Sequence, residues 1–580
     1  MELLLLIMEN DEIKDATTKR IRKFQEIRGK DIGNVQFWDI VVITARDENQ
    51  RRAYDLQLKE KLENKQLPLG VKYLSIADPP EAKVGNGGST MHVLLQLKTR
   101  FENDLASMKV LLIHAGGYSQ RLPNASLLGK AFMPLPLGDP LYQMLEMKLI
   151  TYIDLPSRMD PGVFVCSSDT LELFVLDRGH HNHSWSFKSP GFTALAHQSS
   201  LLIGTTHGVF VLSEDLDLDS NDSVFTESLQ FLHKPSVDVM KEMGAVRQHS
   251  SGSKDFVFTD SAYFMDYHTA NRLIDFYQNH APILCEIDAY GDFLQALGCR
   301  GSSEYTKNSQ NVSEETGNLV STREQVFQLL TGTPFHVIAF NKSVFYHLGT
   351  TTEYLHHLCE DVQLLNQLGA AWNDNTTTEP RHKRMRTTDG RPGRMCLMHS
   401  VIDEQVVKTM SIVEYCHLKN VRIGNNCIIS NCKLKSKQLV VVPDNTFLST
   451  ACIQIRHKQM YVTFIFNIHD NLKQSSRSLA DLNFFRQPVE SIFSENQEEI
   501  KATLFPLNCA TFKLWEMKMF TPSETMEESV TIALKLQVDI TSNIQLKLSE
   551  FSKSLSMDDI LNMKFVEGVL QYRRNLAVIL

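Results

Sequence analysis

Six short runs rich in Val, Ile, Leu and Phe constrain the fold of this chain more than any other feature of its sequence. Uninterrupted apolar strands that alternate with helical stretches of ten or more residues are typical of a mostly parallel sheet covered on both faces. We therefore predict an α/β fold, with its ligands at the carboxyl ends of the strands. The runs span residues 38–45, 109–115, 162–166, 208–212, 256–259 and 336–340.

The length of 580 residues is too great for one ordinary core, so we expect two or three domains. A stretch rich in Thr, Arg, Pro and Gly without an apolar period predicts an exposed linker. Its basic run at 381–386 is either a solvated loop or a patch for nuclear import or polyanions. The predicted boundaries are 1–35 for an N-terminal helical extension, 36–370 for the main domain, 371–396 for the linker, 397–460 for a repeat domain and 461–580 for an α+β region.

Apolar residues beyond the linker recur every five or six positions, which fits neither a helix nor a simple alternating strand. The spacing predicts a coil of short strands, as in hexapeptide β-helices, with a plain β-meander as the alternative. Capping boxes at 525–528 and 556–559 predict terminal helices, which serve either as an oligomer surface or as packing within the chain. The recurring residues are Ile402, Val407, Val413, Leu418, Ile423, Ile429 and Leu434.

The composition excludes several classes of protein. A net charge of -9 argues against a nucleic-acid partner or an acidic membrane surface, since both recruit clustered Lys and Arg. No run approaches the roughly 20 apolar residues of a membrane span, and the apolar start of the chain is too short for a signal peptide. The ten cysteines contain no CxxC pair, so we expect reduced thiols and a cytoplasmic location.

A first glycine-rich turn, Gly85-Asn-Gly-Gly-Ser-Thr90, leads into a helical stretch that we expect to begin near Met91. Glycines let backbone N–H groups approach phosphates closely, and a helix start adds a positive dipole end. Gly85, Gly87, Gly88 and Ser89 are therefore candidate nucleotide-binding residues. The alternative is a tight turn in which Ser89 or Thr90 caps the helix.

A second glycine-rich turn follows the strand at 109–115 and carries the more specific signal. Gly116 and Gly117 come directly after the strand, Arg121 lies five residues past the first glycine, and Lys130 lies nine further on. Backbone donors at the two glycines suit a triphosphate. Arg121 and Lys130 suit the negative charge that develops between an α-phosphate and departing pyrophosphate.

These residues resemble the sugar-phosphate nucleotidyltransferases, in which a strand ends in a Gly-Gly loop with Thr-Arg and a later Lys-Pro. Further stretches match in the same order. Cys166-Ser-Ser-Asp169 ends a strand, as the metal-binding Asp of that superfamily does, and His233-Lys-Pro-Ser236 is similar to its Glu-Lys-Pro. The resemblance implies that Asp169 binds a metal ion and that Lys234 contacts the sugar phosphate.

A narrower resemblance, convincing over about residues 15–370, is to the fucose-1-phosphate guanylyltransferase family. It implies a Rossmann-like, GT-A-type nucleotidyltransferase domain followed by a degenerate left-handed β-helix-like domain with terminal helices. It also implies GTP and L-fucose-1-phosphate as substrates, GDP-L-fucose and pyrophosphate as products, and Mg²⁺ or Mn²⁺ as the cofactor. His207 joins Lys234 as a sugar-phosphate residue. The similar stretches are 85–90, 115–126, 191–197, 204–210 and 286–293.

Departures from the superfamily pattern leave the second metal ligand open. His347 stands where the superfamily has a second Asp, and an imidazole is a poor partner for Mg²⁺. Asp288 is our predicted second ligand, since Asp288 and Asp292 would share one face if their stretch is helical. The other candidates considered are Asp260, Glu286 and Asp292. Two other functions stay open, namely the same reaction with another sugar or base, and a non-catalytic homologue that binds sugar nucleotides.

Overall fold

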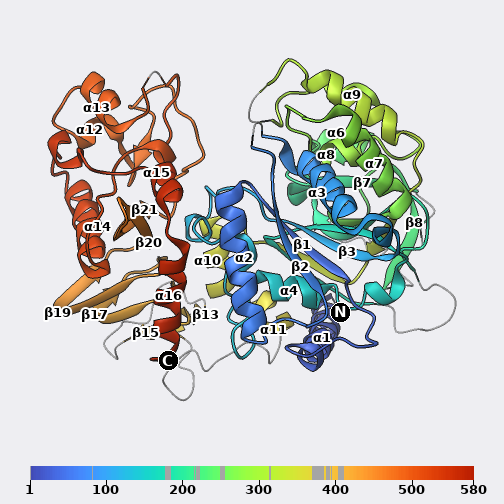
Figure 1. Cartoon of the computed structure of the whole chain (residues 1–580), viewed down its shortest axis with the longest axis horizontal. Coiled ribbons are helices and arrows are strands. Elements are labelled where there is room, and N and C mark those ends of the chain that lie inside the picture. The colour runs from blue at the N-terminus through green and yellow to red at the C-terminus, as the bar shows by residue number, and fades with distance from the viewer. Residues whose placement is uncertain are drawn as a thin grey trace. The chain divides into compact units, whose positions relative to one another are not determined.

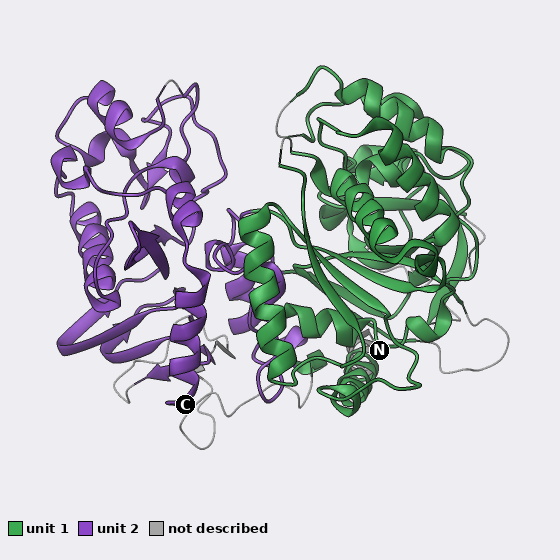
Figure 2. Cartoon of the chain, viewed as in Figure 1, with its two compact units in different colours: residues 1–117, 144–347, 366–369 green, residues 118–143, 348–365, 370–580 purple. Residues whose placement is uncertain are grey.

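The chain forms two compact units (Figure 2). Residues 1–117, 144–347 and 366–369 make the first unit, and residues 118–143, 348–365 and 370–580 make the second. The computed structural model describes residues 2–80, 83–176, 185–213, 216, 222–248, 255–312, 315–368, 385–386, 392–393, 395–402, 410–507 and 509–580, with side chains except at 2–9, 385–386 and 392–393.

The two units do not follow the boundaries predicted along the sequence. The segment 118–143, which carries Arg121 and Lys130, and the segment 348–365 group with the C-terminal part of the chain. Most of the predicted linker at 371–396, including most of its basic run, lies outside the described residues.

A nine-stranded sheet forms the centre of the first unit, in the order β2-β1-β3-β4-β9-β6-β10-β8-β7 (Figure 1). The first four strands in this order run parallel to one another, whereas β9 is antiparallel to both of its neighbours. The sheet is therefore mixed rather than mostly parallel, because an apolar run shows that a strand is buried but not which way it points. The strands are β1 Ile40–Ala45, β2 Lys72–Ala77, β3 Lys109–His114, β4 Gly162–Ser167, β6 Phe192–Ser200, β7 Gly208–Leu212, β8 Ser223–His233, β9 Phe256–Asp266 and β10 Phe335–Phe340.

Both faces of this sheet are buried, as its uninterrupted apolar strands predict. Ile40 and Val42 of β1 lie in one core with residues of α3 and α7, while Val41 and Ile43, on the opposite face, are also fully buried. A second, two-stranded sheet pairs β5 Thr170–Phe174 with β11 Ser343–His347. The helices of the unit are α1 Glu2–Ile27, α2 Glu48–Glu63, α3 Gly85–Phe101, α4 Met144–Thr151, α5 Leu201–Gly204, α6 Val237–Glu242, α7 Tyr267–His280, α8 Gly291–Leu294 and α9 Leu319–Leu330.

The N-terminal helix α1 packs on the first unit. Ile13 and Phe24 are fully buried. The Arg20 guanidinium donates to Asp154 Oδ2 at 3.2 Å and to Phe174 O at 2.7 Å, and it lies over the Phe174 ring. From residue 10, where its side chains are described, the predicted N-terminal helical extension therefore packs against the rest of the first unit.

The second unit contains the predicted coil of short strands. One sheet joins β14, β16, β18 and β20, and another joins β15, β17 and β19, with parallel pairing from turn to turn. Parallel stacking excludes a β-meander, whose strands are antiparallel. The earlier turns place residues 16 apart on neighbouring strands, as with Glu414 and Ser430, whereas later pairs such as Ile428 and Phe447 are 19 apart. The left-handed sense of the coil stays a prediction.

A long antiparallel pair, β20 with β21, and the terminal helices complete the second unit. The capping box at Ser556 and Asp559 is present, and the Thr525 side chain caps α14 by accepting from Glu528 N. Among the described residues, no helix has both the length and the apolar character needed to cross a bilayer. The remaining elements are α10 Thr351–Cys359, α11 Val362–Leu368, β12 Met385–Arg386, β13 Pro392–Gly393, β14 Cys396–Met398, β15 Val401–Ile402, β16 Ile412–Glu414, β17 His417–Ile423, β18 Ile428–Ser430, β19 Lys433–Val442, β20 Thr446–Ile455, β21 Lys458–Asn467, β22 Asn483–Phe484, β23 Gln487–Pro488, α12 Val489–Ile492, α13 Gln497–Leu504, α14 Met526–Thr541, α15 Met557–Met563 and α16 Val566–Ala577.

Candidate functional site

The turn after β3 is fixed from the neighbouring strand and helix. Thr44 Oγ1, on β1, accepts from the N–H groups of Ala115 and Gly116 at 3.1 and 3.3 Å, and Gln50 Nε2, on α2, donates to Gly117 O at 2.8 Å. The N–H of Gly116 is therefore engaged within the protein. This weakens the prediction that Gly116 contacts a phosphate through its backbone donor.

Gly117 is the better placed of the two glycines. It has φ +112, a conformation that L side chains rarely adopt, and a Cβ built there would meet no atom within 4 Å. Gly116, by contrast, lies against the end of β1, where a Cβ would come 3.3 Å from Arg46 N. The open side of the turn is thus at Gly117, at the carboxyl end of a parallel strand.

The first glycine-rich turn differs from its prediction. Helix α3 begins at Gly85 rather than near Met91, so Ser89 and Thr90 lie inside the helix and do not cap it. Gly85 and Gly87 are needed for close packing, because a Cβ at these positions would come 2.4 and 2.8 Å from Ile287 O. The Gly87 N–H also donates to Ile287 O at 2.8 Å.

The packing of this turn against Ile287 argues against Gly87 as a phosphate donor. Nucleotide contacts from Gly85, Gly88 and Ser89 stay predictions. A contact between Thr90 of this helix and His114 of β3 was not predicted from the sequence. Thr90 Oγ1 lies 2.8 Å from His114 Nε2, and burial lowers the pKa of His114 to about 4, which keeps that imidazole neutral at physiological pH.

The two predicted sugar-phosphate residues are neighbours. Strands β7 and β8 pair so that Gly208 lies opposite His233, and the N–H of Lys234 donates to His207 O at 3.0 Å. Lys234 has φ +50, which is uncommon for a residue with a side chain and is often found at functional sites. The structure therefore brings Lys234 and His207 together.

Acidic residues lie next to this pair. Asp260 Oδ1 accepts from Gly208 N at 2.7 Å, and Asp288 Oδ1 accepts from the N–H groups of Tyr290 and Gly291 at 2.8 and 2.9 Å. Burial raises the pKa of Asp260, while the neighbouring imidazoles of His207 and His233 oppose the rise. Burial lowers the pKa of His233, against the charges of Asp288 and Asp260. These groups form one cluster of titratable side chains in the first unit.

Two of the alternative metal ligands have other partners. Asp292 is fully buried in an ion pair with Arg323 at 3.0 Å, and Glu286 pairs with Lys83 at 3.1 Å. The idea that Asp288 and Asp292 share one helical face is wrong. Asp288 precedes α8, and its N–H donates to Asp292 Oδ2 at 2.7 Å, so Asp292 supports Asp288 from within the core.

Asp169 lies just past the end of β4 and faces His347. Its Oδ2 is 3.5 Å from His347 Nε2, and its Oδ1 accepts from Ser167 Oγ at 3.0 Å. The His347 ring is in turn 6.3 Å from the His207 ring, centre to centre. Asp169, His347 and His207 therefore form a row that leads to the cluster around Lys234.

A fully buried polar network lies beneath Asp169, and no motif in the sequence had indicated it. Lys148 Nζ contacts Thr170 Oγ1 at 2.7 Å and Glu172 Oε1 at 3.3 Å. The Tyr152 hydroxyl donates to Glu172 Oε2 at 2.7 Å. Because Ser167 Oγ lies 3.2 Å from Thr170 Oγ1, the network reaches the residue that holds Asp169.

Arg121 and Lys130 belong to the second unit. The Arg121 side chain is exposed, and its carbonyl accepts from Thr351 N at 3.0 Å. Lys130 is half-buried and follows Gly129, which has φ +89. That Arg121 and Lys130 act together with Asp169 stays a prediction.

Comparison with known proteins identifies the family. The fucose pyrophosphorylase domain matches residues 102–525. Fucose-1-phosphate guanylyltransferase of Mus musculus is 41% identical over 587 residues, covering 97% of this chain and 97% of the mouse protein. The Homo sapiens protein of that name is 40% identical over 584 residues, covering 97% of this chain and 94% of its own length. The chain belongs to the fucose-1-phosphate guanylyltransferase family.

A plant protein matches a smaller share of the chain. The bifunctional fucokinase/GDP-fucose pyrophosphorylase of Arabidopsis thaliana is 25% identical over 247 residues, which cover 37% of this chain and 22% of the plant protein.

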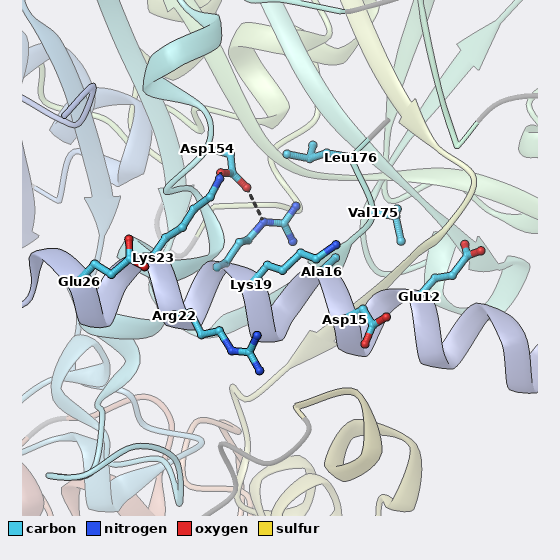
Figure 3. Close-up of a pocket in the computed structure, with 11 residues that line it drawn as sticks. Glu12, Asp15, Ala16, Lys19, Arg22, Lys23, Glu26, Asp154, Val175 and Leu176 are labelled. Atoms are coloured by element: carbon cyan, nitrogen blue, oxygen red, sulfur yellow. Dashed lines mark hydrogen bonds and ion pairs between the residues drawn. The ribbon is translucent and has the colours of Figure 1, made fainter. Parts of the chain in front are cut away.

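Two features of this member of the fucose-1-phosphate guanylyltransferase family lie apart from the predicted site residues. A cavity of about 340 Å³ runs along α1 and is lined by Lys19, Arg20 and Asp154 among others (Figure 3). Within the described part of the chain, one group of His and acidic residues has three ligand atoms within 4.8 Å of one another, namely His356, His357 and Asp361. Neither feature contains a residue that the sequence predicts for the reaction.

Proposed function

We propose that this chain transfers GMP from GTP to L-fucose-1-phosphate, giving GDP-L-fucose and pyrophosphate. The observation that carries the proposal is the identity of 40–41% over 97% of the chain with two proteins named fucose-1-phosphate guanylyltransferase. The cluster of Lys234, His207 and nearby acids in the first unit supports it, because these groups suit a sugar phosphate and a cation.

The reaction needs little acid–base chemistry from the protein. A phosphate oxygen of fucose-1-phosphate is already ionised at neutral pH, attacks the α-phosphorus of GTP in line, and displaces pyrophosphate. In this proposal Lys234 and His207 hold the sugar phosphate, Gly117 lets the nucleotide approach the turn, and Arg121 and Lys130 stabilise charge on the transferring and departing phosphates.

Chain connectivity supports a common role for Gly117 and Arg121. Four residues of fully extended chain span at most about 14 Å. The Arg121 backbone is therefore tethered to within that distance of the Gly117 turn.

The residues present suit Mg²⁺ or Mn²⁺ as the cofactor. Hard cations take oxygen ligands, and Mg²⁺ is usually held by one or two carboxylates together with substrate phosphates. Asp169 is a partly exposed carboxylate, and Asp288 Oδ2 has no hydrogen bond to the described residues. We propose that these two carboxylates hold the ion, which when bound neutralises phosphate charge.

Four finer features belong to the same proposal. We propose that the first unit has the GT-A type of nucleotidyltransferase fold and that the coil is left-handed. The ten free cysteines support a reducing, cytoplasmic location. The terminal helices suit either an oligomer surface or packing within the chain.

The direct test measures pyrophosphate release by the purified protein with GTP, L-fucose-1-phosphate and Mg²⁺, omitting each component in turn. A panel of ATP, UTP and CTP, and of mannose-1-phosphate and glucose-1-phosphate, tests the alternative substrates. We expect turnover only with the complete mixture and strongest turnover with the guanine and fucose pair. Tight GDP-L-fucose binding without turnover would contradict the proposal.

Variants of the two cations test their roles. Arg121→Ala and Lys130→Ala should each lower kcat by about 10²–10³-fold, the usual cost of one transition-state charge contact. Arg477→Ala and Lys437→Ala, at exposed positions in the same unit, serve as matched controls. Near-normal kcat in both site variants would remove Arg121 and Lys130 from the mechanism.

A further inference from the structure

Glu414 is a buried carboxylate at the end of strand β16, with only 1% of its surface exposed. Its Oε1 accepts from Asn124 Nδ2 at 3.0 Å and from Ser430 Oγ at 2.7 Å, and its Oε2 accepts from the Tyr354 hydroxyl at 3.0 Å. Asn124 belongs to the segment 118–143, Tyr354 to helix α10, and Ser430 to the next turn of the coil. One side chain therefore joins three segments of the second unit.

A carboxylate at this position has a free-energy cost that an apolar residue would avoid. Its neighbours on the strand, Ile412 and Val413, are fully buried, so an apolar side chain would suit the coil interior. A buried charge that is fully hydrogen-bonded often adds little net stability, and in some proteins it selects one arrangement of the groups around it. The contacts of Glu414 indicate which arrangement it selects.

Both segments that bind Glu414 lead to Arg121. Asn124 lies three residues after Arg121 and six before Lys130. Tyr354 lies on α10, and the N–H of Thr351, in the first turn of that helix, donates to Arg121 O at 3.0 Å. Glu414 thus holds the segment that carries the two cations and also the helix that fixes the Arg121 backbone.

Other C-terminal residues hold the same segment along its length. Lys564 Nζ lies 3.4 Å from Leu127 O, and Gln143 Nε2 donates to the Tyr415 hydroxyl at 3.2 Å. The Tyr118 ring stacks on Trp515 with 6.3 Å between ring centres.

We infer that the C-terminal coil positions the cation-bearing segment, and that Glu414 is a positioning residue that acts on Arg121 and Lys130 through Asn124 and Tyr354. The inference rests on the proposed function, since it assigns the coil a role in that reaction. It predicts that the donor–acceptor pairing between residues 124 and 414 sets turnover, not merely stability.

A swap of donor and acceptor tests this pairing. Asn124→Asp replaces the amide donor by a second carboxyl group, so at a pH where both groups are ionised the segment must shift. In Glu414→Gln, the amide oxygen still accepts from Asn124, and the amide nitrogen can donate to the Tyr354 hydroxyl. That hydroxyl can then donate its own proton to Pro134 O, which lies 3.2 Å away. In the double variant N124D/E414Q, the new amide at position 414 supplies a donor toward residue 124, and the pair is restored with its roles exchanged.

We expect N124D to lower kcat by about 100-fold, the size of loss that an ångström-scale displacement of a catalytic group causes, with KM for fucose-1-phosphate changed less than threefold. The kcat of E414Q should stay within about tenfold of that of the parent protein, and the kcat of the double variant should be at least tenfold higher than that of N124D. Hydrogen exchange in peptides from 122–137 should quicken in N124D and slow again in the double variant, with peptides from 72–101 unchanged.

Gln537→Leu is the matched control. Gln537 Nε2 donates to Thr446 Oγ1 at 2.7 Å in another buried bond to the coil that does not involve residues 118–143, so its loss should lower Tm without lowering kcat. Wild-type kcat in N124D, or a double variant no better than N124D in both kcat and exchange, would overturn the inference. If the parent protein has no turnover, the proposed function fails, and the exchange data still decide whether the pairing holds the segment.

Discussion

Replacing Lys148 by Met should lower the free energy of unfolding, because it leaves the buried carboxylate of Glu172, beneath Asp169, without its cationic partner. Lys148 and Glu172 are both about 1% exposed, and the ammonium contacts Glu172 Oε1 at 3.3 Å. Burial alone would raise the pKa of Glu172, but the charges of Lys148 and His197 hold it below its ordinary value. Without Lys148, the carboxyl is left buried and unpaired, so we expect it to bind a proton.

The expected loss in the free energy of unfolding follows from the cost of keeping Glu172 protonated. Holding a carboxyl of ordinary pKa 4.5 protonated at pH 7 costs about 3.4 kcal/mol, at 1.36 kcal/mol per pH unit. The lost hydrogen bond to Thr170 adds about 1 kcal/mol. The sum, about 4 kcal/mol, agrees with the 3–5 kcal/mol that breaking a buried ion pair typically costs.

The sign of the pH dependence separates this account from a simple packing defect. In the variant, the folded protein binds one proton more than the unfolded chain, so its stability falls as pH rises. The deficit relative to the parent should therefore shrink by about 1.4 kcal/mol per unit between pH 7 and pH 5. If His197 took the proton instead, the stability of the variant itself would stop depending on pH below the ordinary His pKa of 6.5, but the deficit would still shrink, because burial holds the pKa of His197 in the parent at about 4.

Urea unfolding followed by tryptophan fluorescence at pH 5, 6 and 7 measures the deficit, since Trp38 and Trp185 are buried in the first unit. Lys148→Met/Glu172→Gln is the matched control, because it removes the charge with its partner and should recover most of the loss. A deficit below about 1 kcal/mol at pH 7, well under the usual cost of breaking a buried pair, or one that does not change with pH, would show that Glu172 is not left as an unpaired buried carboxyl group.

Three further outcomes are expected. Gly85→Ala should destabilise the protein by about 1–3 kcal/mol, because the φ of Gly85 is +70 and the new Cβ would meet Ile287 O. Gly117→Ala should destabilise the protein less, because a Cβ there meets no atom within 4 Å, but should lower turnover more. Thermal unfolding measures the stabilities, and pyrophosphate release measures turnover. Burial raises the pKa of Asp470 to about 7, so the folded protein binds more protons than the unfolded chain between about pH 4 and 7, and its free energy of unfolding falls as pH rises through that range. Asp470→Asn should therefore raise Tm at pH 7.5 but not at pH 4. EDTA should abolish turnover, and Mg²⁺ or Mn²⁺ should restore it; activity that survives chelation would exclude the metal site at Asp169 and Asp288.

The positions of six of the nine central strands could be predicted from the sequence, but β2, β6 and β8 were missed and the strand directions could not be predicted. Each apolar run corresponds to a strand, because burial on both faces leaves a local pattern. Direction depends on the connections between strands, and β9 runs antiparallel to β4 and β6 without any change in its own composition. The coil was predicted because its period is local and repeats.

Lys234 and His207 were each predicted from a short motif, and the pairing of β7 with β8 explains why they lie next to each other. Their role in binding a sugar phosphate stays a prediction. The glycines at 85–88 were harder to interpret, because a glycine needed near a phosphate and one needed near Ile287 look alike in a sequence. Glu414 could not be found, since its partner Asn124 is 290 residues away.

Three buried carboxyl groups in the described part of this chain each support a segment that carries a predicted site residue. Glu172 lies beneath Asp169, Asp292 accepts from the N–H of Asp288, and Glu414 holds the segment of Arg121. Buried charges are a poor source of stability, because apolar residues of similar volume often stabilise as well or better. Their repeated position therefore favours a role in fixing geometry. Replacing Lys148 and Glu172 together by Met and Leu should then leave Tm unchanged or raised while turnover falls, and equal turnover in that variant would argue for a purely structural pair.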